Sequence, residues 1–340
     1  MIALFSVAAF VLSVGAVRAF LEVSRRRLVD RPGARSSHER PTPTGGGFPA
    51  IVVFLAVAAV AVALDVVSGG PRWWAAALCA GTLGLLGLVD DAFDLPRSAR
   101  YATHVLVATA IVHWVGHPGP RFGLGGAAAS VAAVVFVTGL INAFNFMDGI
   151  DALVGSTGVL IVGFLAWVTH DPIWILLAAC YCGFLVFNLP PARIFMGDAG
   201  STALGGLVGV AVLSGRAALE PRHFLIFAPL IGDSAYTVVR RLLRRENILK
   251  AHHSHMYQRL LRAGHSHARI SGSYAAATLA LGAWAVWAGN GAAWVGVLGC
   301  IALAIALEIY LSRRGVPFRR PTRRSEPTGS VPRPSGSGQD

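Results

Sequence analysis

Charged residues are scarce in this chain of 340 residues. They make up 14% of it, whereas hydrophobic residues make up 54%. Soluble domains carry about 25% charged residues, so an ordinary soluble enzyme is excluded. Repeated apolar runs of about 20 residues predict a polytopic membrane protein. Because the runs are unbroken and do not alternate with polar residues, they favour membrane helices over a transmembrane barrel.

Cysteine is also scarce, with four residues, and all four lie inside predicted membrane spans. Cys180 and Cys182 stand two positions apart, which directs them to different faces of a helix and excludes a two-cysteine metal clip. We interpret all four as small apolar side chains, namely Cys79, Cys180, Cys182 and Cys300.

Eleven apolar segments predict eleven transmembrane helices in an all-α fold. The first has no basic residue before Arg18 and no small-x-small cleavage site, so we expect a retained helix. Residues 1–314 are predicted to form one membrane domain, and the Pro-, Ser-, Gly- and Arg-rich residues 315–340 a disordered cytoplasmic tail. The predicted spans are 2–23, 47–67, 73–92, 100–116, 124–144, 152–169, 172–189, 201–215, 222–242, 270–288 and 291–312.

Most of the 29 basic residues lie in alternate connecting segments and in the tail, on one side of the membrane. By the positive-inside rule, this distribution predicts an N-terminus outside and a cytoplasmic C-terminus. Anionic lipid headgroups and phosphate substrates are sufficient to explain such a basic face, so we expect no nucleic acid as a partner.

Acidic side chains gather where the third span reaches the cytoplasm, at Asp90, Asp91 and Asp94. Three carboxylates within five residues suit Mg²⁺ or Mn²⁺ held together with substrate phosphates. The structural alternative is a set of solvated acids paired with Arg97 or Arg100. The helix dipole disfavours acids at a helix C-terminus, which argues against a purely structural role.

A polar stripe follows the exit of the fifth span. Asn142, Asn145 and Asp148 recur every three residues, Asp151 continues the series, and Gly149 permits a turn. Amides and carboxylates on one face suit a sugar, a uracil edge or a metal. Hydrogen bonding between helices is the structural alternative.

Two further acids stand alone. Asp198 follows Phe195-Met196-Gly197 where two spans meet, and its small neighbours allow a phosphate to approach the backbone. We expect Ser201 to cap the helix that follows. Asp233 lies inside the ninth span, where an acid indicates either function or a buried hydrogen-bond partner.

Three histidines, His252, His253 and His255, stand among basic residues in the last large cytoplasmic loop. No cysteine is near and the spacing matches no standard zinc ligand set. An imidazole cluster with basic neighbours suits diphosphate oxygens better, and a solvated surface loop is the alternative.

Together these motifs resemble the polyprenyl-phosphate N-acetylhexosamine-1-phosphate transferase superfamily, which includes the MraY and WecA enzymes. The resemblance runs in family order from about residue 35 to 270. The histidine loop departs from the three consecutive histidines of MraY, and the eleven predicted helices also favour the WecA side, which initiates O-antigen and other surface polysaccharides. The matching pieces are Pro41–Gly47, Asp90-Asp91-x-x-Asp94, Asn142 to Asp151, Phe195 to Ser201 and the histidine loop.

The resemblance implies one reaction. A polyprenyl phosphate such as undecaprenyl phosphate attacks the β-phosphorus of a UDP-sugar, UMP leaves, and a polyprenyl diphosphate-sugar remains. The expected donor is a UDP-N-acetylhexosamine such as UDP-GlcNAc, and the expected cofactor is Mg²⁺, with Mn²⁺ as its alternative. The expected location is the bacterial inner membrane, with the site on the cytoplasmic face, and a homodimer is left open.

The resemblance also implies roles for individual residues. Asp90, Asp91 and Asp198 would hold the metal or handle the lipid phosphate, and which of Asp90 and Asp91 binds metal or acts as a base stays open. We expect Arg97 and Arg100 to steer the lipid phosphate. Substrate contacts are expected from Asn142, Asn145, Asp148, Gly149, Ile150, Asp151, Phe195, His253 and His255, with Gly149, Ile150, Asp151 and Phe195 near uracil and the two histidines on the diphosphate.

A membrane transporter of a nucleotide-sugar or another anionic solute is the alternative function. Transporters place their binding site near the bilayer midplane on broken helices, often within inverted repeats. Here the polar groups gather at predicted cytoplasmic helix ends and no repeat is visible, which favours the enzyme.

Overall fold

The computed structural model describes residues 1–32, 40–116, 125–215, 218–247, 254–316 and 318. These residues are helical except for loops and a two-residue antiparallel ribbon of β1 (Val29–Asp30) and β2 (Thr42–Pro43). Five of the described helices are long and apolar enough to cross a membrane, and three shorter ones are also apolar. The protein is therefore an all-helical, polytopic membrane protein, as its composition predicted.

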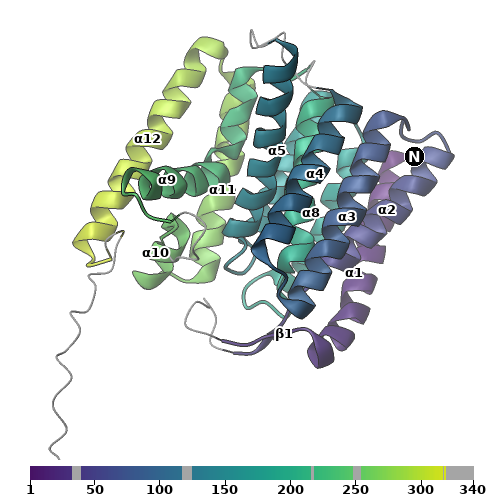
Figure 1. The fold of residues 1–340 in the computed structure, drawn as a ribbon, viewed down its shortest axis with the longest axis horizontal. Coiled ribbons are helices and arrows are strands. Elements are labelled where there is room, and N and C mark those ends of the chain that lie inside the picture. Colours follow the sequence, from purple (N-terminus) through teal and green to yellow (C-terminus); the bar gives the residue numbers. More distant parts are fainter. Residues whose placement is uncertain (33–39, 117–124, 216–217, 248–253, 317, 319–340) are drawn as a thin grey trace, which may run out of the picture.

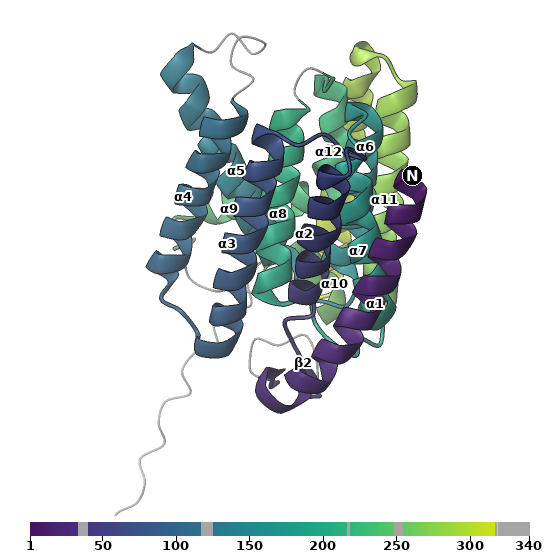
Figure 2. The same ribbon diagram turned by 90° about the vertical axis from the view of Figure 1, so that its right-hand side faces the viewer.

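The first eight helices run up and down through one bundle (Figure 1 and Figure 2). The helix α8 is central, because 83% of its most apolar window is buried among its neighbours. These helices are α1 (Ile2–Arg27), α2 (Gly47–Ala63), α3 (Pro71–Phe93), α4 (Arg97–Val115), α5 (Gly126–Met147), α6 (Leu153–Thr169), α7 (Ile173–Asn188) and α8 (Gly197–Ser214).

Glycines let α8 pack against its neighbours at backbone distance. A Cβ at Gly205 would lie 2.8 Å from the carbonyl oxygen of Leu140 on α5. At the start of α8, a Cβ on Gly47 of α2 would collide with the backbone of Gly200. On α3, a Cβ on Gly87 would collide with the backbone of Ala199. The ends of α2, α3 and α8 are thus held together without intervening side chains, which fixes the residues that follow.

The second part of the chain departs from the predicted pattern of spans. It contains the 3-10 helix η2 (Pro221–Phe227), then α9 (Ala228–Leu243), α10 (Met256–Arg262), α11 (His267–Trp287) and α12 (Asn290–Arg313). The predicted span 222–242 is not one straight helix, since η2 and α9 divide it and α9 lies across α11 and α12 (Figure 1). Pro229 in the first turn of α9 lacks an amide hydrogen, which permits this break.

The last described residues lie against α9 and α10. The carbonyl oxygen of Val316 accepts hydrogen bonds from Arg259, at 3.3 and 3.1 Å. The ring of Phe318 is buried, and the guanidinium of Arg240 lies 4.5 Å from its centre. Both residues follow the predicted domain boundary at 314, so contacts with the membrane domain extend to Phe318.

Candidate functional site

A cleft of about 420 Å³ lies at the end of the bundle that carries β1, where the motifs of the sequence meet. Its lining extends from Val29, the first residue of β1, to His267 at the start of α11. Seven predicted site residues line it, namely Asp91, Asp148, Gly149, Ile150, Asp151, Phe195 and Asp198.

Four helices contribute to a group of polar side chains beside this cleft. Arg100 of α4 lies between two carboxylates, with its Nη1 2.5 Å from Asp90 of α3 and 3.2 Å from Asp198 of α8. The side-chain amide of Asn145, on α5, donates to Asp198 at 2.8 Å. The other Asp90 oxygen accepts the backbone amide of Leu95 at 2.7 Å. Both oxygens of Asp90 and of Asp198 therefore have protein partners.

Asp91 has one carboxylate oxygen that is not satisfied by the protein. Its Oδ1 accepts the backbone amide of Asp198 at 3.0 Å, whereas Oδ2 is buried and has no hydrogen-bond partner among the described residues. A buried, unpaired carboxylate oxygen is costly. Gly197, with φ +75°, lies so close that a Cβ there would collide with this oxygen. The backbone at Gly197 is therefore in direct contact with the Asp91 carboxylate.

These carboxylates fit a divalent cation of the Mg²⁺ type. Within the described part of the chain, no three acidic, histidine or cysteine side chains converge as a complete ligand set. Magnesium is commonly held by only one or two carboxylates, with substrate phosphates completing its shell. The unsatisfied Oδ2 of Asp91, with Asp198 bonded to the same carboxylate through its backbone, suits such a partial set.

The Pro- and Gly-rich segment before α2 positions the acids through its backbone. The amide of Phe195 donates to the carbonyl of Pro43 at 2.8 Å. In return, Gly46 and Gly47 donate to the carbonyls of Phe195 and Met196, both at 2.9 Å. This ladder fixes the start of α8. The expected cap by Ser201 is wrong, because α8 begins earlier, at Gly197, and the Ser201 hydroxyl donates to the Gly197 carbonyl at 3.1 Å.

Asp151, which also lines the cleft, is engaged by groups of the protein itself. Its Oδ2 accepts the amide of Ala192 at 3.0 Å, and its Oδ1 lies 3.1 Å from Nδ1 of His267. Its carbonyl accepts the Ser271 hydroxyl at 2.6 Å. Burial alone would raise the pKa of Asp151, but the bonds from His267 and Ala192 outweigh it and lower that pKa below its usual value. The Asp151 carboxylate is therefore ionised and is held in one orientation by its contacts with Ala192 and His267.

Asp148 is another acid in the cleft lining. Burial, together with the charges of Asp198, Asp91 and Asp151, raises the pKa of its carboxyl well above the usual value. The neighbouring Gly149 has no room for a side chain, because a Cβ there would collide with the Tyr257 hydroxyl. The turn after α5 thus brings one more acid into the cleft and packs directly on Tyr257 of α10.

The described part of the histidine loop faces Asp233. Nδ1 of His255 lies 3.6 Å from the Asp233 carboxylate, which also accepts the amides of Met256 at 2.7 Å and Tyr257 at 3.1 Å. The Tyr274 hydroxyl of α11 donates to it at 2.7 Å. Asp233 is therefore a buried hydrogen-bond partner, one of the two readings that the sequence left open. His255 is buried beside it and is not part of the cleft lining, and His252 and His253 lie outside the described residues.

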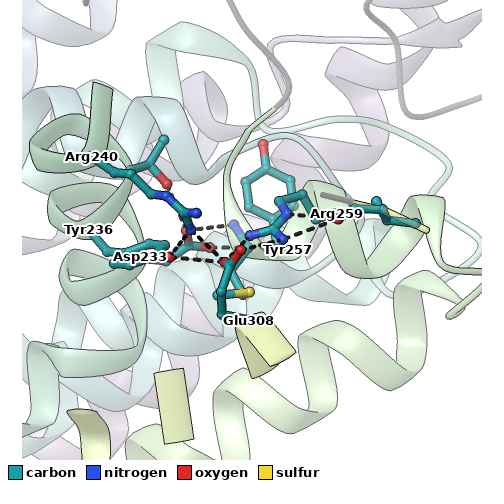
Figure 3. Close-up of polar contacts among 9 residues, drawn as sticks. Asp233, Tyr236, Arg240, Tyr257, Arg259 and Glu308 are labelled. Carbon is teal, nitrogen blue, oxygen red and sulfur yellow. Dashed lines mark hydrogen bonds and ion pairs between the residues drawn. The ribbon is translucent and has the colours of Figure 1, made fainter. Parts of the chain in front are cut away.

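A second network joins α10 to α9 and α12 (Figure 3). The Glu308 carboxylate receives Arg259 at 2.5 and 3.1 Å, Arg240 at 2.7 Å and the Tyr236 hydroxyl at 2.9 Å. The Arg259 side chain is fully buried. Because α10 directly follows His255, this network also holds His255 in position.

Six of the expected site residues that the structure describes do not line the cleft, namely Asp90, Arg97, Arg100, Asn142, Asn145 and His255. Asn142 donates to the carbonyl of Thr138 in its own helix at 2.8 Å, one turn deeper than Asn145. Arg97 is the first residue of α4, whereas Arg100 makes the contacts with Asp90 and Asp198.

Sequence reasoning missed Gln258 and His267, which both line the cleft. For His267 a local signal exists, because Ser266 caps α11 and its hydroxyl accepts the amide of Arg269 at 3.3 Å. The cap predicts where the helix begins. It does not predict that its first side chain meets Asp151, which is far away in the sequence.

The chain matches the model of a known protein family. The match, to glycosyl transferase family 4, covers residues 73–216. The chain is also similar to the undecaprenyl-phosphate alpha-N-acetylglucosaminyl 1-phosphate transferase of Thermotoga maritima, at 30% identity over 238 residues, or 68% of this chain and 72% of the relative. The chain belongs to glycosyl transferase family 4.

Two further relatives have names of the same kind. A probable undecaprenyl-phosphate N-acetylglucosaminyl 1-phosphate transferase of Bacillus subtilis is 29% identical over 260 residues, 70% of this chain and 71% of the relative. The decaprenyl-phosphate N-acetylglucosaminephosphotransferase of Mycobacterium tuberculosis is 26% identical over 292 residues, 73% of this chain and 72% of the relative. The part that matches glycosyl transferase family 4 contains Asp90, Asn145 and Asp198, whereas His255 and His267 follow it.

Proposed function

We propose that this protein transfers N-acetylhexosamine 1-phosphate from a UDP-sugar to undecaprenyl phosphate or a related polyprenyl phosphate. An oxygen of the lipid phosphate attacks the β-phosphorus of the donor, the bond to the α-phosphate oxygen breaks, and UMP leaves. The observation that carries the proposal is the Asp198 carboxylate, held by Arg100 and Asn145 beside the unsatisfied Oδ2 of Asp91. Phosphoryl transfer requires mainly such positioning and charge stabilisation.

Asp91 and Asp198 would hold Mg²⁺, or Mn²⁺ in its place. When bound, the ion supplies positive charge to the diphosphate and to the departing UMP. Asp90 is assigned a different role, because it does not line the cleft as Asp91 and Asp198 do, and its carboxylate pairs with Arg100. It holds Arg100, and we do not include it in the proposed metal shell.

Arg100 would receive the lipid phosphate at the edge of the carboxylates, and Arg97, at the start of the same helix, would steer it there. A phosphate monoester has a second pKa of about 6, so the nucleophile is mostly a dianion at neutral pH. No side chain is therefore required as a strong base. Asn145 orients Asp198 by donating to it at 2.8 Å.

The nucleotide would lie along the wall formed after α5 and before α8. Asp148, Gly149, Ile150 and Phe195 border the cleft together, and they include both polar groups and an aromatic ring suited to uracil. The contact of His253 with the diphosphate stays a prediction, because His253 lies outside the described residues. For His255 we propose a positioning role, because its imidazole lies against the Asp233 carboxylate.

We further propose eleven membrane crossings, with the N-terminus outside and the cleft on the cytoplasmic face of the bacterial inner membrane. The distribution of arginine supports this orientation, since Arg25, Arg26 and Arg27 end α1 directly before β1, at the end of the bundle with the cleft. Residues 1–318 would form the transferase domain. The product would initiate a surface polysaccharide.

The test uses purified protein with undecaprenyl phosphate, Mg²⁺ and a panel of UDP-sugars, and it measures UMP release. We expect UMP from one N-acetylhexosamine donor, dependent on both the lipid and the ion. Lipid-independent uptake of intact nucleotide-sugar into proteoliposomes, without UMP, would instead support the transporter.

A further inference from the structure

The cleft has an unbalanced charge. Five aspartates line it, namely Asp30, Asp91, Asp148, Asp151 and Asp198. Among the described lining residues, His267 is the one side chain that can carry a positive charge. A nucleotide diphosphate is an anion, so every ionised carboxylate among them, Asp151 included, repels it unless cationic groups offset the charge.

His267 is held in a fixed orientation at this wall. It is the first residue of α11, and its Nδ1 lies 3.1 Å from Oδ1 of Asp151. Asp151 is itself fixed by the Ala192 amide at 3.0 Å, and its carbonyl by the Ser271 hydroxyl at 2.6 Å. A carboxylate that binds one ring nitrogen orients an imidazole and favours its charged form. The amides that begin α11 add partial positive charge at the same place.

We propose that His267 contacts the donor, with its imidazole donating a hydrogen bond from Nε2 to a phosphate oxygen of the nucleotide. Asp151 is then a positioning residue for His267 and does not itself contact uracil. This inference rests on the proposed function, because it assigns one more contact to the same donor. It also explains why an acid that is already bonded on both carboxylate oxygens lines the cleft.

Two substitutions separate contact with the donor from support of the fold. In His267→Asn, the amide can still bond Asp151 but does not extend to the far side of the ring. In His267→Gln, the longer side chain extends toward the position of Nε2. If His267 only holds α11 in place through Asp151, both variants should bind the donor as the wild type does, or His267→Asn should lose less donor binding than His267→Gln. If it contacts the donor, His267→Asn should be the more damaging.

The measurements are steady-state kinetics and inhibition by UMP. A lost charge-assisted hydrogen bond should raise the KM for the UDP-sugar, and the inhibition constant of UMP, by roughly tenfold in His267→Asn. We expect kcat and the KM for undecaprenyl phosphate to stay within about threefold, and His267→Gln to recover part of the loss. His265→Asn is the matched control, because His265 lies 2.9 Å from the Tyr310 hydroxyl and is not part of the cleft lining.

Direct titration of UMP into the purified protein makes the test independent of turnover. Weaker UMP binding in His267→Asn than in His265→Asn supports the inference, even if the donor sugar has been chosen wrongly. Equal UMP binding and equal donor KM in His267→Asn and the wild type would overturn it. Wild-type protein that neither binds UMP nor releases it would overturn the proposed function as well.

Discussion

Glu308, near the end of α12, binds the guanidinium of Arg259 on α10 with both carboxylate oxygens, at 2.5 and 3.1 Å. The two residues are 49 positions apart in the sequence. Arg259 also donates to the carbonyl of Val316, so the residues that directly follow α12 pack against the pair. The last helix therefore supports the wall of the cleft that contains Gln258, although α12 does not line the cleft itself.

Removing the Glu308 carboxylate should destabilise the protein, because it leaves the fully buried Arg259 without its counter-charge. Breaking a buried pair in this way costs on the order of 3 kcal/mol, so Glu308→Ala should lower the thermal unfolding midpoint clearly. The control is Glu22→Ala. Glu22 pairs with Arg25 on an exposed surface, where the loss should stay below about 0.5 kcal/mol. Equal midpoints for the two variants would contradict the assignment.

Two truncations should differ although they end four residues apart. A chain that ends after Phe318 keeps the ring against Arg240 and should retain turnover. A chain that ends after Arg314 loses that ring and the Val316 carbonyl that accepts from Arg259. We expect it to be less stable and several-fold slower, measured as UMP release per folded protein. Full activity of the shorter chain would mean that these contacts are dispensable.

Asp198→Asn should abolish transfer while leaving the protein folded in membranes. The substitution keeps the shape of the side chain but removes the charge that faces Arg100 and the proposed cation, so we expect turnover to fall by about 100-fold or more. Asp94→Asn is the control, because Asp94 is exposed and its left-handed backbone, φ +49°, suits asparagine. Near-normal turnover of Asp198→Asn at any Mg²⁺ concentration would remove Asp198 from the site.

Gly197→Ala should disturb the site more than its backbone angle alone predicts. Gly197 has φ +75°, and an added methyl group would collide with Oδ2 of Asp91. Gly264 has a similar φ of +93° with no atom near its missing Cβ, so Gly264→Ala measures the conformational cost alone. Turnover should fall steeply in Gly197→Ala and little in Gly264→Ala. Similar losses in the two variants would show that backbone strain, and not the collision, is responsible.

The sequence predicted most of the helices because the bilayer requires long apolar runs. It also predicted that Asp91, Asp148, Asp151 and Asp198 would lie together, because they stand at helix ends on one side of the bundle. It could not choose between Arg97 and Arg100, which stand one turn apart on α4. Their distances to Asp90 and Asp198 depend on how α4 packs against α3 and α8. The sequence also could not predict that Asp233 pairs with His255, because this contact depends on α9 crossing its neighbours and not running parallel to them (Figure 1).

The glycine contacts of α2, α3 and α8 have a consequence for redesign of the enzyme. Gly47 packs against the backbone of Gly200, and Gly87 packs against the backbone of Ala199. Even an alanine at Gly47 or at Gly87 is too large for these contacts. Random mutagenesis at these two positions should therefore yield mostly inactive chains. Variants with a new donor preference should come from the wall of the cleft that contains Gln258, whose side chain can be exchanged without a clash between backbones.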